Sequence, residues 1–125
     1  MATRLDLLVR LKTTLIDFFD ELIELLPEEA DLVVARIFLN DQIPIEDIMN
    51  YIVYKLIPLK EMVVEQNDKF FLENNILFEQ LDENKVNHFK RIWENKVLET
   101  DDRNTIWKWF RSFIFLAEKY NGTKS

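Results

Sequence analysis

The chain has 125 residues, the length of one domain, and its 48% apolar content is ample for a hydrophobic core. It has no cysteine, one histidine and one glycine, which excludes disulfides, cysteine-based or multi-histidine metal sites and glycine-rich phosphate loops. Its net charge of −7 opposes binding to a nucleic-acid backbone. We therefore expect a single domain over residues 1–125 with no cofactor.

The first predicted helix runs from about Thr3 to Leu26, because apolar residues recur there every three or four positions. Its broad apolar face carries Leu8, Leu11, Leu15, Phe18, Phe19, Leu22 and Leu26. Lys12 is the one charged residue inside that apolar arc. At 1.5 Å per residue the helix would be roughly 36 Å long, which suits the spine of a bundle.

The second predicted helix is short. Pro27 is expected to end the first helix and to take the first position of the second, where its missing N–H needs no partner. The second helix is expected to end near Leu39, with Asp41 as a candidate N-cap for the next one. Pro44 is then predicted to begin a third helix.

Pro58 predicts a break in the third helix at about Ile57, because proline lacks an N–H and crowds the preceding turn. A second limb is expected from Leu59 to Val64. Residues 66–84 are less regular, and we expect short helical turns there that plug the core.

The last third of the chain predicts two more helices. Asp82 is a candidate cap for a helix whose inward residues are Val86, Phe89, Ile92, Trp93 and Val97. Thr100 is a candidate hydroxyl cap for the last helix, from about Asp101 to Tyr120, and Asn121–Gly122 is a candidate stop signal. The predicted fold class is therefore all-α, a single compact bundle of about five to seven helices.

The last helix contains one apolar residue that is out of place. Phe115 lies in the middle of a polar arc, surrounded by Lys108, Arg111 and Lys119. Another element of the fold could cover it, in which case it is a core residue. Alternatively, arginine beside an aromatic residue is typical of protein interfaces, and these four residues would form a protein-contact surface.

An acidic stripe on the first helix is the candidate metal site. Asp17, Asp20, Glu21 and Glu24 share one helix face, and Asp17, Glu21 and Glu24 could hold Mg²⁺ together with substrate phosphates. All-α nucleotide pyrophosphatases use paired carboxylate motifs, and Glu21–Glu24 matches the first of the two. No convincing second motif follows, and no lysine or arginine stands beside the stripe as a phosphate clamp, so a solvated helix face is the competing interpretation.

Two further candidate sites are His88 and a basic set of residues in the last third of the chain. His88 has no serine or carboxylate at a spacing that would make it a base, and we expect it near the surface. A basic set could form a nucleic-acid surface, although acidic residues are interleaved with it. This set comprises Lys85, Lys90, Arg91, Lys96, Arg103, Lys108 and Arg111.

Charge is unevenly distributed along the chain. Residues 1–31 carry a net charge of −5 and residues 101–125 a net charge of +2. The two regions are either separate solvated faces or attract each other, within one molecule or between two. Arg4, Asp6, Arg10 and Lys12 interrupt the first apolar residues, so no secretory signal is expected, and the default is a soluble intracellular protein without membrane association.

Four segments of the last third of the chain form a distinctive set, namely Lys85–Trp93, Asp101–Asp102, Ile106–Phe110 and Leu116–Tyr120. Together they resemble the C-terminal half of a family of small proteins from large nucleocytoplasmic DNA viruses. The resemblance covers mainly residues 82–120. It implies a viral protein acting in a host cell or virion, and it implies no activity and no catalytic residues.

Three functions follow as hypotheses. The first is a non-enzymatic protein-binding or structural module, able to self-associate as a homodimer, that uses Lys108, Arg111, Phe115 and Lys119. The alternative is a metal-dependent nucleotide hydrolase that uses Asp17, Glu21 and Glu24. The third is weak nucleic-acid binding through the basic C-terminal third.

Overall fold

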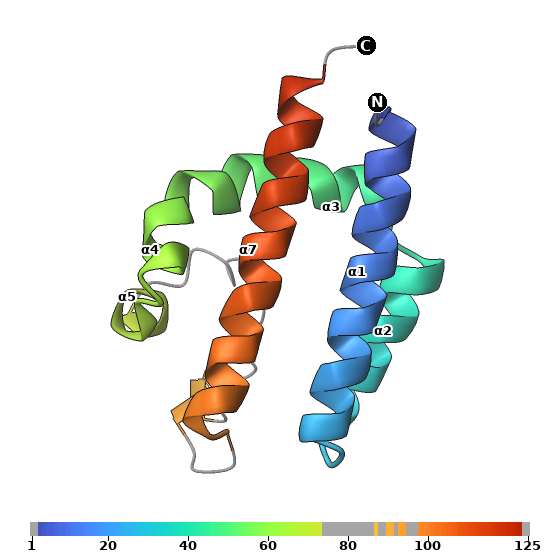
Figure 1. Cartoon of the computed structure of the whole chain (residues 1–125). Helices are drawn as coiled ribbons and strands as arrows, with labels where there is room; N and C mark the ends of the chain where they lie inside the picture. Colours follow the sequence, from blue (N-terminus) through green and yellow to red (C-terminus); the bar gives the residue numbers. More distant parts are fainter. Residues whose placement is uncertain (1–2, 74–86, 88–89, 92, 95–97, 124–125) are drawn as a thin grey trace.

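The computed structural model describes residues 3–73, 87, 90–91, 93–94 and 98–123 (Figure 1). All regular secondary structure within these residues is helical, which confirms the predicted all-α class. Most of the helix expected after Asp82 lies outside the described residues, although Leu98 is buried and Trp93 is half-buried.

Helix α1 (Arg4–Leu25) matches the first predicted helix. It begins with a capping box, in which the Thr3 hydroxyl accepts the Asp6 N–H and the Asp6 carboxylate accepts the Thr3 N–H, both at 3.1 Å. The Thr3 N–H is also the main reason that the pKa of Asp6 lies below its ordinary value. The start of α1 is therefore fixed by its own sequence.

Helix α2 (Ala30–Asp41) packs beside α1. Pro27 follows the C-cap of α1, Leu26, as predicted, but it does not begin the second helix. The chain first turns back through a hydrogen bond from Glu29 N–H to the Leu26 carbonyl, and α2 begins only at Ala30. Asp41 is the last residue of α2 rather than the cap of the next helix. The turn places α2 beside α1, where its buried Leu39 joins the core cluster.

Helix α3 (Ile45–Tyr51) continues into a π-helix, η1 (Ile52–Leu56), a 3₁₀ turn, η2 (Ile57–Leu59), and helix α4 (Lys60–Val64). Pro44 is the N-cap of α3. Pro58 causes the irregular stretch, because it has no N–H for the preceding turn, and the Ile57 N–H bonds instead to the Ile52 carbonyl five residues back. The predicted break near Ile57 is confirmed, and Figure 1 shows the chain bending from α3 down into α4.

The end of α4 is a Schellman motif. Gln66 N–H bonds to the Val63 carbonyl and Asn67 N–H to the Met62 carbonyl, with Gln66 in the left-handed region at φ 55°. Asn67 then caps the short helix α5 (Asp68–Glu73), because its Oδ1 accepts the Phe70 N–H at 3.0 Å. The polar residues at 66–68 therefore end helix α4 and begin helix α5.

Helix α7 (Thr100–Gly122) is the longest element in the described part of the chain. Its N-cap is Glu99 rather than Thr100, because Glu99 and Asp102 form the reciprocal capping box. Gly122 is the last helical residue and has no positive φ, so the predicted glycine stop is wrong and Thr123 is the C-cap.

Helix α7 is central in the fold. It packs against α1 on one side and against η1 and α4 on the other (Figure 1). Trp107 and Ile114, which the helical pattern puts at the margin of its apolar face, are therefore 3% and 2% exposed. The Trp107 indole N–H donates to the Asp68 carboxylate at 3.2 Å, which joins α7 to α5.

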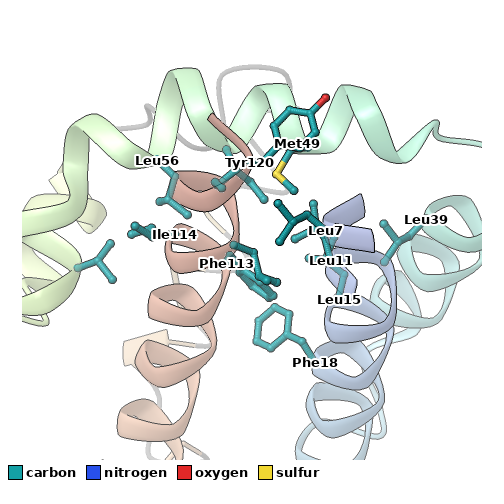
Figure 2. Close-up of a cluster of buried hydrophobic side chains, with 14 of the residues drawn as sticks. Leu7, Leu11, Leu15, Phe18, Leu39, Met49, Leu56, Phe113, Ile114 and Tyr120 are labelled. Atoms are coloured by element: carbon teal, nitrogen blue, oxygen red, sulfur yellow. The ribbon is translucent and has the colours of Figure 1, made fainter. Parts of the chain in front are cut away.

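The core lies where α1, α3 and α7 meet (Figure 2). Phe18 of α1 stands among three aromatic rings of α7, with centroid distances of 5.4 Å to Phe113, 5.8 Å to Trp109 and 6.0 Å to Phe110. The same core cluster includes the aliphatic side chains of Leu7, Leu11, Leu15, Met49, Leu56, Ile114 and Leu116. This contact between the first and last helices positions the outer face of α7.

Candidate functional site

All four predicted contact residues lie on the exposed face of α7. Lys108, Arg111 and Lys119 are exposed, and the Phe115 side chain is 53% exposed. The Lys119 ammonium lies 4.5 Å from the centre of the Phe115 ring, a cation–π distance. Phe115 is therefore a surface residue in this fold.

The neighbours of Phe115 along α7 explain its exposure. Phe113 and Ile114, 4% and 2% exposed, belong to the core cluster. Successive helix residues are about 100° apart, so one further step carries the Phe115 side chain out of the contacts of α7 with α1 and α4. No described element covers the ring.

A shallow groove runs beside Phe115 between α7 and α1. It is lined by Arg10 and Thr14 of α1 and by Arg111, Ser112, Phe115 and Leu116 of α7. The two hydroxyls bond to carbonyls of their own helices, Thr14 to Arg10 at 2.7 Å and Ser112 to Lys108 at 3.1 Å. The guanidinium groups of Arg10 and Arg111 are therefore the main polar groups that the groove can offer to a ligand.

We call the set Arg10, Thr14, Lys108, Arg111, Ser112, Phe115 and Lys119 the α7 contact surface. Across the described residues neither Lys108 nor Arg111 forms an ion pair, whereas Arg10 lies close enough to Asp6 to contribute to the lowered pKa of that carboxyl. The nearest acidic residue along α7 is Glu118. Its carboxylate forms an ion pair with the Lys60 ammonium of α4 at 3.0 Å. A chain with a net charge of −7 thus carries one locally cationic face with an aromatic ring in it.

The acidic stripe of α1 is divided between two neighbouring helices. Asp20 pairs with Arg36 of α2 at 2.6 Å, and Glu21 accepts the Trp109 indole N–H of α7 at 2.7 Å. Asp17 and Glu24 remain exposed between them. Across the described part of the chain, no three carboxylate or histidine side chains come together as a group that could hold a metal ion.

The described members of the basic set do not all face the solvent. Arg103 turns inward, with Nη2 2.5 Å from the Trp93 carbonyl and its guanidinium carbon 5.9 Å from the Trp93 ring. His88, Lys85 and Lys96 lie outside the described residues. Of the set, Lys108 and Arg111 belong to the α7 contact surface.

One exposed apolar surface, on α2, was not predicted from the sequence. Four apolar side chains of α2, namely Val33, Val34, Ile37 and Phe38, are 43–51% exposed. Their spacing carried a signal, because residues at i, i+1, i+4 and i+5 share one side of a helix while Leu32 and Leu39 bury the other. A helix that is apolar all round cannot turn every residue toward one neighbour.

The sequence matches no protein-family model, and no curated protein or solved structure matches it. None of the helices in the described ranges has the length and apolar character needed to cross a bilayer. The functional argument therefore rests on the surfaces of this fold.

Proposed function

We propose that this chain is a protein-binding module and that the α7 contact surface is where its partner binds. The observation that carries the proposal is the position of Phe115, a large ring that lies outside the core, 53% exposed, in the middle of a cationic face. Isolated exposed apolar residues are common, but this one borders a groove and has two arginines beside it.

The chemistry of the surface supports a protein ligand. An aromatic ring supplies apolar contact area at little cost in side-chain entropy, and arginine adds planar hydrogen bonding to carboxylates, which is why both are enriched at binding hot spots. Arg10 and Arg111 stand on either side of the groove, and Lys108 and Lys119 lie one and two turns away along α7. The partner that fits is an apolar surface bordered by carboxylates.

Site-specific photo-crosslinking tests this proposal. Phe115 is replaced by the photoreactive residue benzoylphenylalanine, and the protein is irradiated in the cells that produce it. We expect a covalent adduct from position 115. Tyr54 is the control position, because it is 75% exposed on η1 and belongs to no candidate surface.

An adduct at position 115 with none at position 54 supports the proposal. No adduct at position 115, or equal adducts at both positions, would mean that the α7 contact surface is ordinary solvated protein surface.

A further inference from the structure

A second surface without a covering element lies on α2. Val33, Val34, Ile37 and Phe38 form an exposed arc that we call the α2 apolar surface. Exposing such an arc to water is unfavourable, because the transfer of aliphatic and aromatic carbon from water to an apolar environment lowers the free energy. Contiguous patches of this kind mark interaction sites more often than scattered exposed residues do.

The surroundings of the α2 apolar surface are acidic. Between Glu28 and Asp41 the chain has four carboxylates and one guanidinium, that of Arg36. Arg36 is already paired with Asp20, and the nearby Lys12 ammonium donates to the Asn40 carbonyl at 3.0 Å. The basic groups near α2 are thus occupied within the molecule.

The α7 contact surface has the opposite composition. Its four basic residues are Arg10, Lys108, Arg111 and Lys119, and the one carboxylate of α7 between Lys108 and Lys119, that of Glu118, is paired with Lys60. The α2 apolar surface is an apolar arc with carboxylates at its ends, and the α7 contact surface is a cationic groove with an aromatic ring. The two surfaces are therefore complementary in charge.

The two surfaces cannot meet within one molecule. Helix α1 lies between α2 and α7 and packs against both (Figure 1). Their complementarity can be satisfied only between copies.

We propose that the α2 apolar surface of one copy docks on the α7 contact surface of a second copy, in a head-to-tail contact. The proposal rests on the proposed function and names the partner as this same chain. Phe115 then lies against Ile37 and Phe38, and Arg10 and Arg111 meet the carboxylates at the ends of α2. The apolar arc consists of four side chains, so the association is expected to be weak and to depend on both the apolar and the charged part.

A symmetric pairing of like surfaces is less favourable. Two α2 helices packed antiparallel would bring Asp41 of one copy beside Glu28 and Asp31 of the other, and parallel packing would bring each carboxylate beside its own counterpart. Two α7 contact surfaces would oppose lysine and arginine in the same way. Like charges that face each other across an interface oppose association.

A head-to-tail contact predicts growth beyond a dimer. A dimer made this way leaves one α2 apolar surface and one α7 contact surface free, so further copies add until a ring closes or the concentration limits growth. The apparent mass should rise with protein concentration above twice 15.1 kDa. It should fall when NaCl is raised from about 0.05 to about 0.5 M, because salt screens the charged part.

Light scattering on two matched variants tests the contact. Ile37→Lys disables the α2 apolar surface and Phe115→Lys the α7 contact surface. Val64→Lys on α4 is the control, because Ile37, Phe115 and Val64 are 51%, 53% and 52% exposed and lysine is a good helix former. Circular dichroism of each variant checks that the fold is kept.

We expect each of the two variants alone to be a 15.1 kDa monomer, with the dissociation constant raised roughly tenfold or more. An equimolar mixture should give a species of two chains and no larger, because one intact surface of each kind remains. The control should behave as the unchanged protein does.

Three results would overturn the proposal. They are a chain that stays monomeric up to about 1 mM, a single variant that still forms dimers, and a mixture that shows no pairing. If the chain is monomeric while position 115 crosslinks to a different protein, the head-to-tail contact is wrong and the proposed function stands. If position 115 gives no adduct at all, both are wrong.

Discussion

The Trp109 indole N–H donates a hydrogen bond to the Glu21 carboxylate over 2.7 Å, and this contact joins α7 to α1 at the edge of the aromatic cluster. Glu21 was a candidate metal ligand in the sequence. In the structure its carboxylate helps to hold the two long helices together instead. The acidic stripe of α1 is therefore in part a structural feature.

The Trp109–Glu21 bond should be measurable by a double-mutant cycle. Trp109→Phe and Glu21→Ala each remove one partner, and a hydrogen bond to a charged group that is partly buried contributes about 1 kcal/mol. We expect a coupling free energy of that size from urea unfolding of the two single variants and the double variant. A coupling near zero would show that the side chains do not interact in solution. Asp17→Ala, on the exposed part of the stripe, is the control and should change stability little.

Phe113 and Phe115 should respond in opposite ways to substitution. Phe113→Ala opens a cavity in the core and should cost about 3–5 kcal/mol of unfolding free energy. Phe115→Glu should change stability by less than about 0.5 kcal/mol and leave the helical content intact, because the ring is on the surface. Far-ultraviolet dichroism with denaturant unfolding distinguishes the two. Unfolding by Phe115→Glu would make Phe115 a core residue and would remove the basis of the proposed function.

Gln66 occupies a position that favours glycine. At φ 55° its β-carbon is crowded by the backbone, and a left-handed residue other than glycine costs about 1 kcal/mol. We expect Gln66→Gly to raise the free energy of unfolding by up to that amount. Thermal unfolding of the variant beside the unchanged protein checks this, and a lower melting temperature would contradict the Schellman geometry.

The sole glycine of the chain gives the reverse control. Gly122 is helical, has no positive φ, and a β-carbon added to it would meet nothing within 4 Å. Gly122→Ala should therefore stabilise the protein by up to about 1 kcal/mol, less if the last turn frays. Destabilisation would indicate that Gly122 ends the helix in a left-handed conformation after all.

The capping box of α1 predicts a pH dependence. The Thr3 backbone N–H, followed by the Thr3 side chain, lowers the pKa of Asp6 below 3.8 in the folded chain. Because the folded pKa is depressed, the stabilisation is fully present above the unfolded value and is lost as the pH falls through the folded value. The stability difference between the unchanged protein and Asp6→Asn should shrink as the pH drops below 3.8. A difference that stays constant from neutral to acid pH would show that the carboxylate does not cap α1.

The sequence predicted the elements that depend on local signals. The 3.6-residue period and the start at Thr3 defined α1, and Pro58 located the bend. These signals act within a few residues, so a single sequence carries them in full. Phe115 was located by the same means, as the one apolar residue in a polar arc.

Features that depend on distant parts of the chain were predicted less well. Trp107 and Ile114 are buried because α4 and η1 cover a second side of α7, and no local pattern says which helices will be neighbours. The exposure of Ile37 and Phe38 has the same origin, since α2 packs mainly against α1 and is apolar on both sides. The groove beside Phe115 required the register between α1 and α7, which only the folded chain defines.

The pairing of α1 with α7 also has a consequence during synthesis. Arg4 Nε donates to the Thr123 carbonyl at 2.7 Å, so α1 is fastened by a residue that is synthesised 119 positions later. At typical translation rates the intervening hundred or so residues take roughly 5–20 s. Throughout that interval the apolar face of α1, with its leucines and Phe18, lacks the α7 side chains that bury it in the folded protein. We expect a chaperone that holds nascent chains to bind this apolar face.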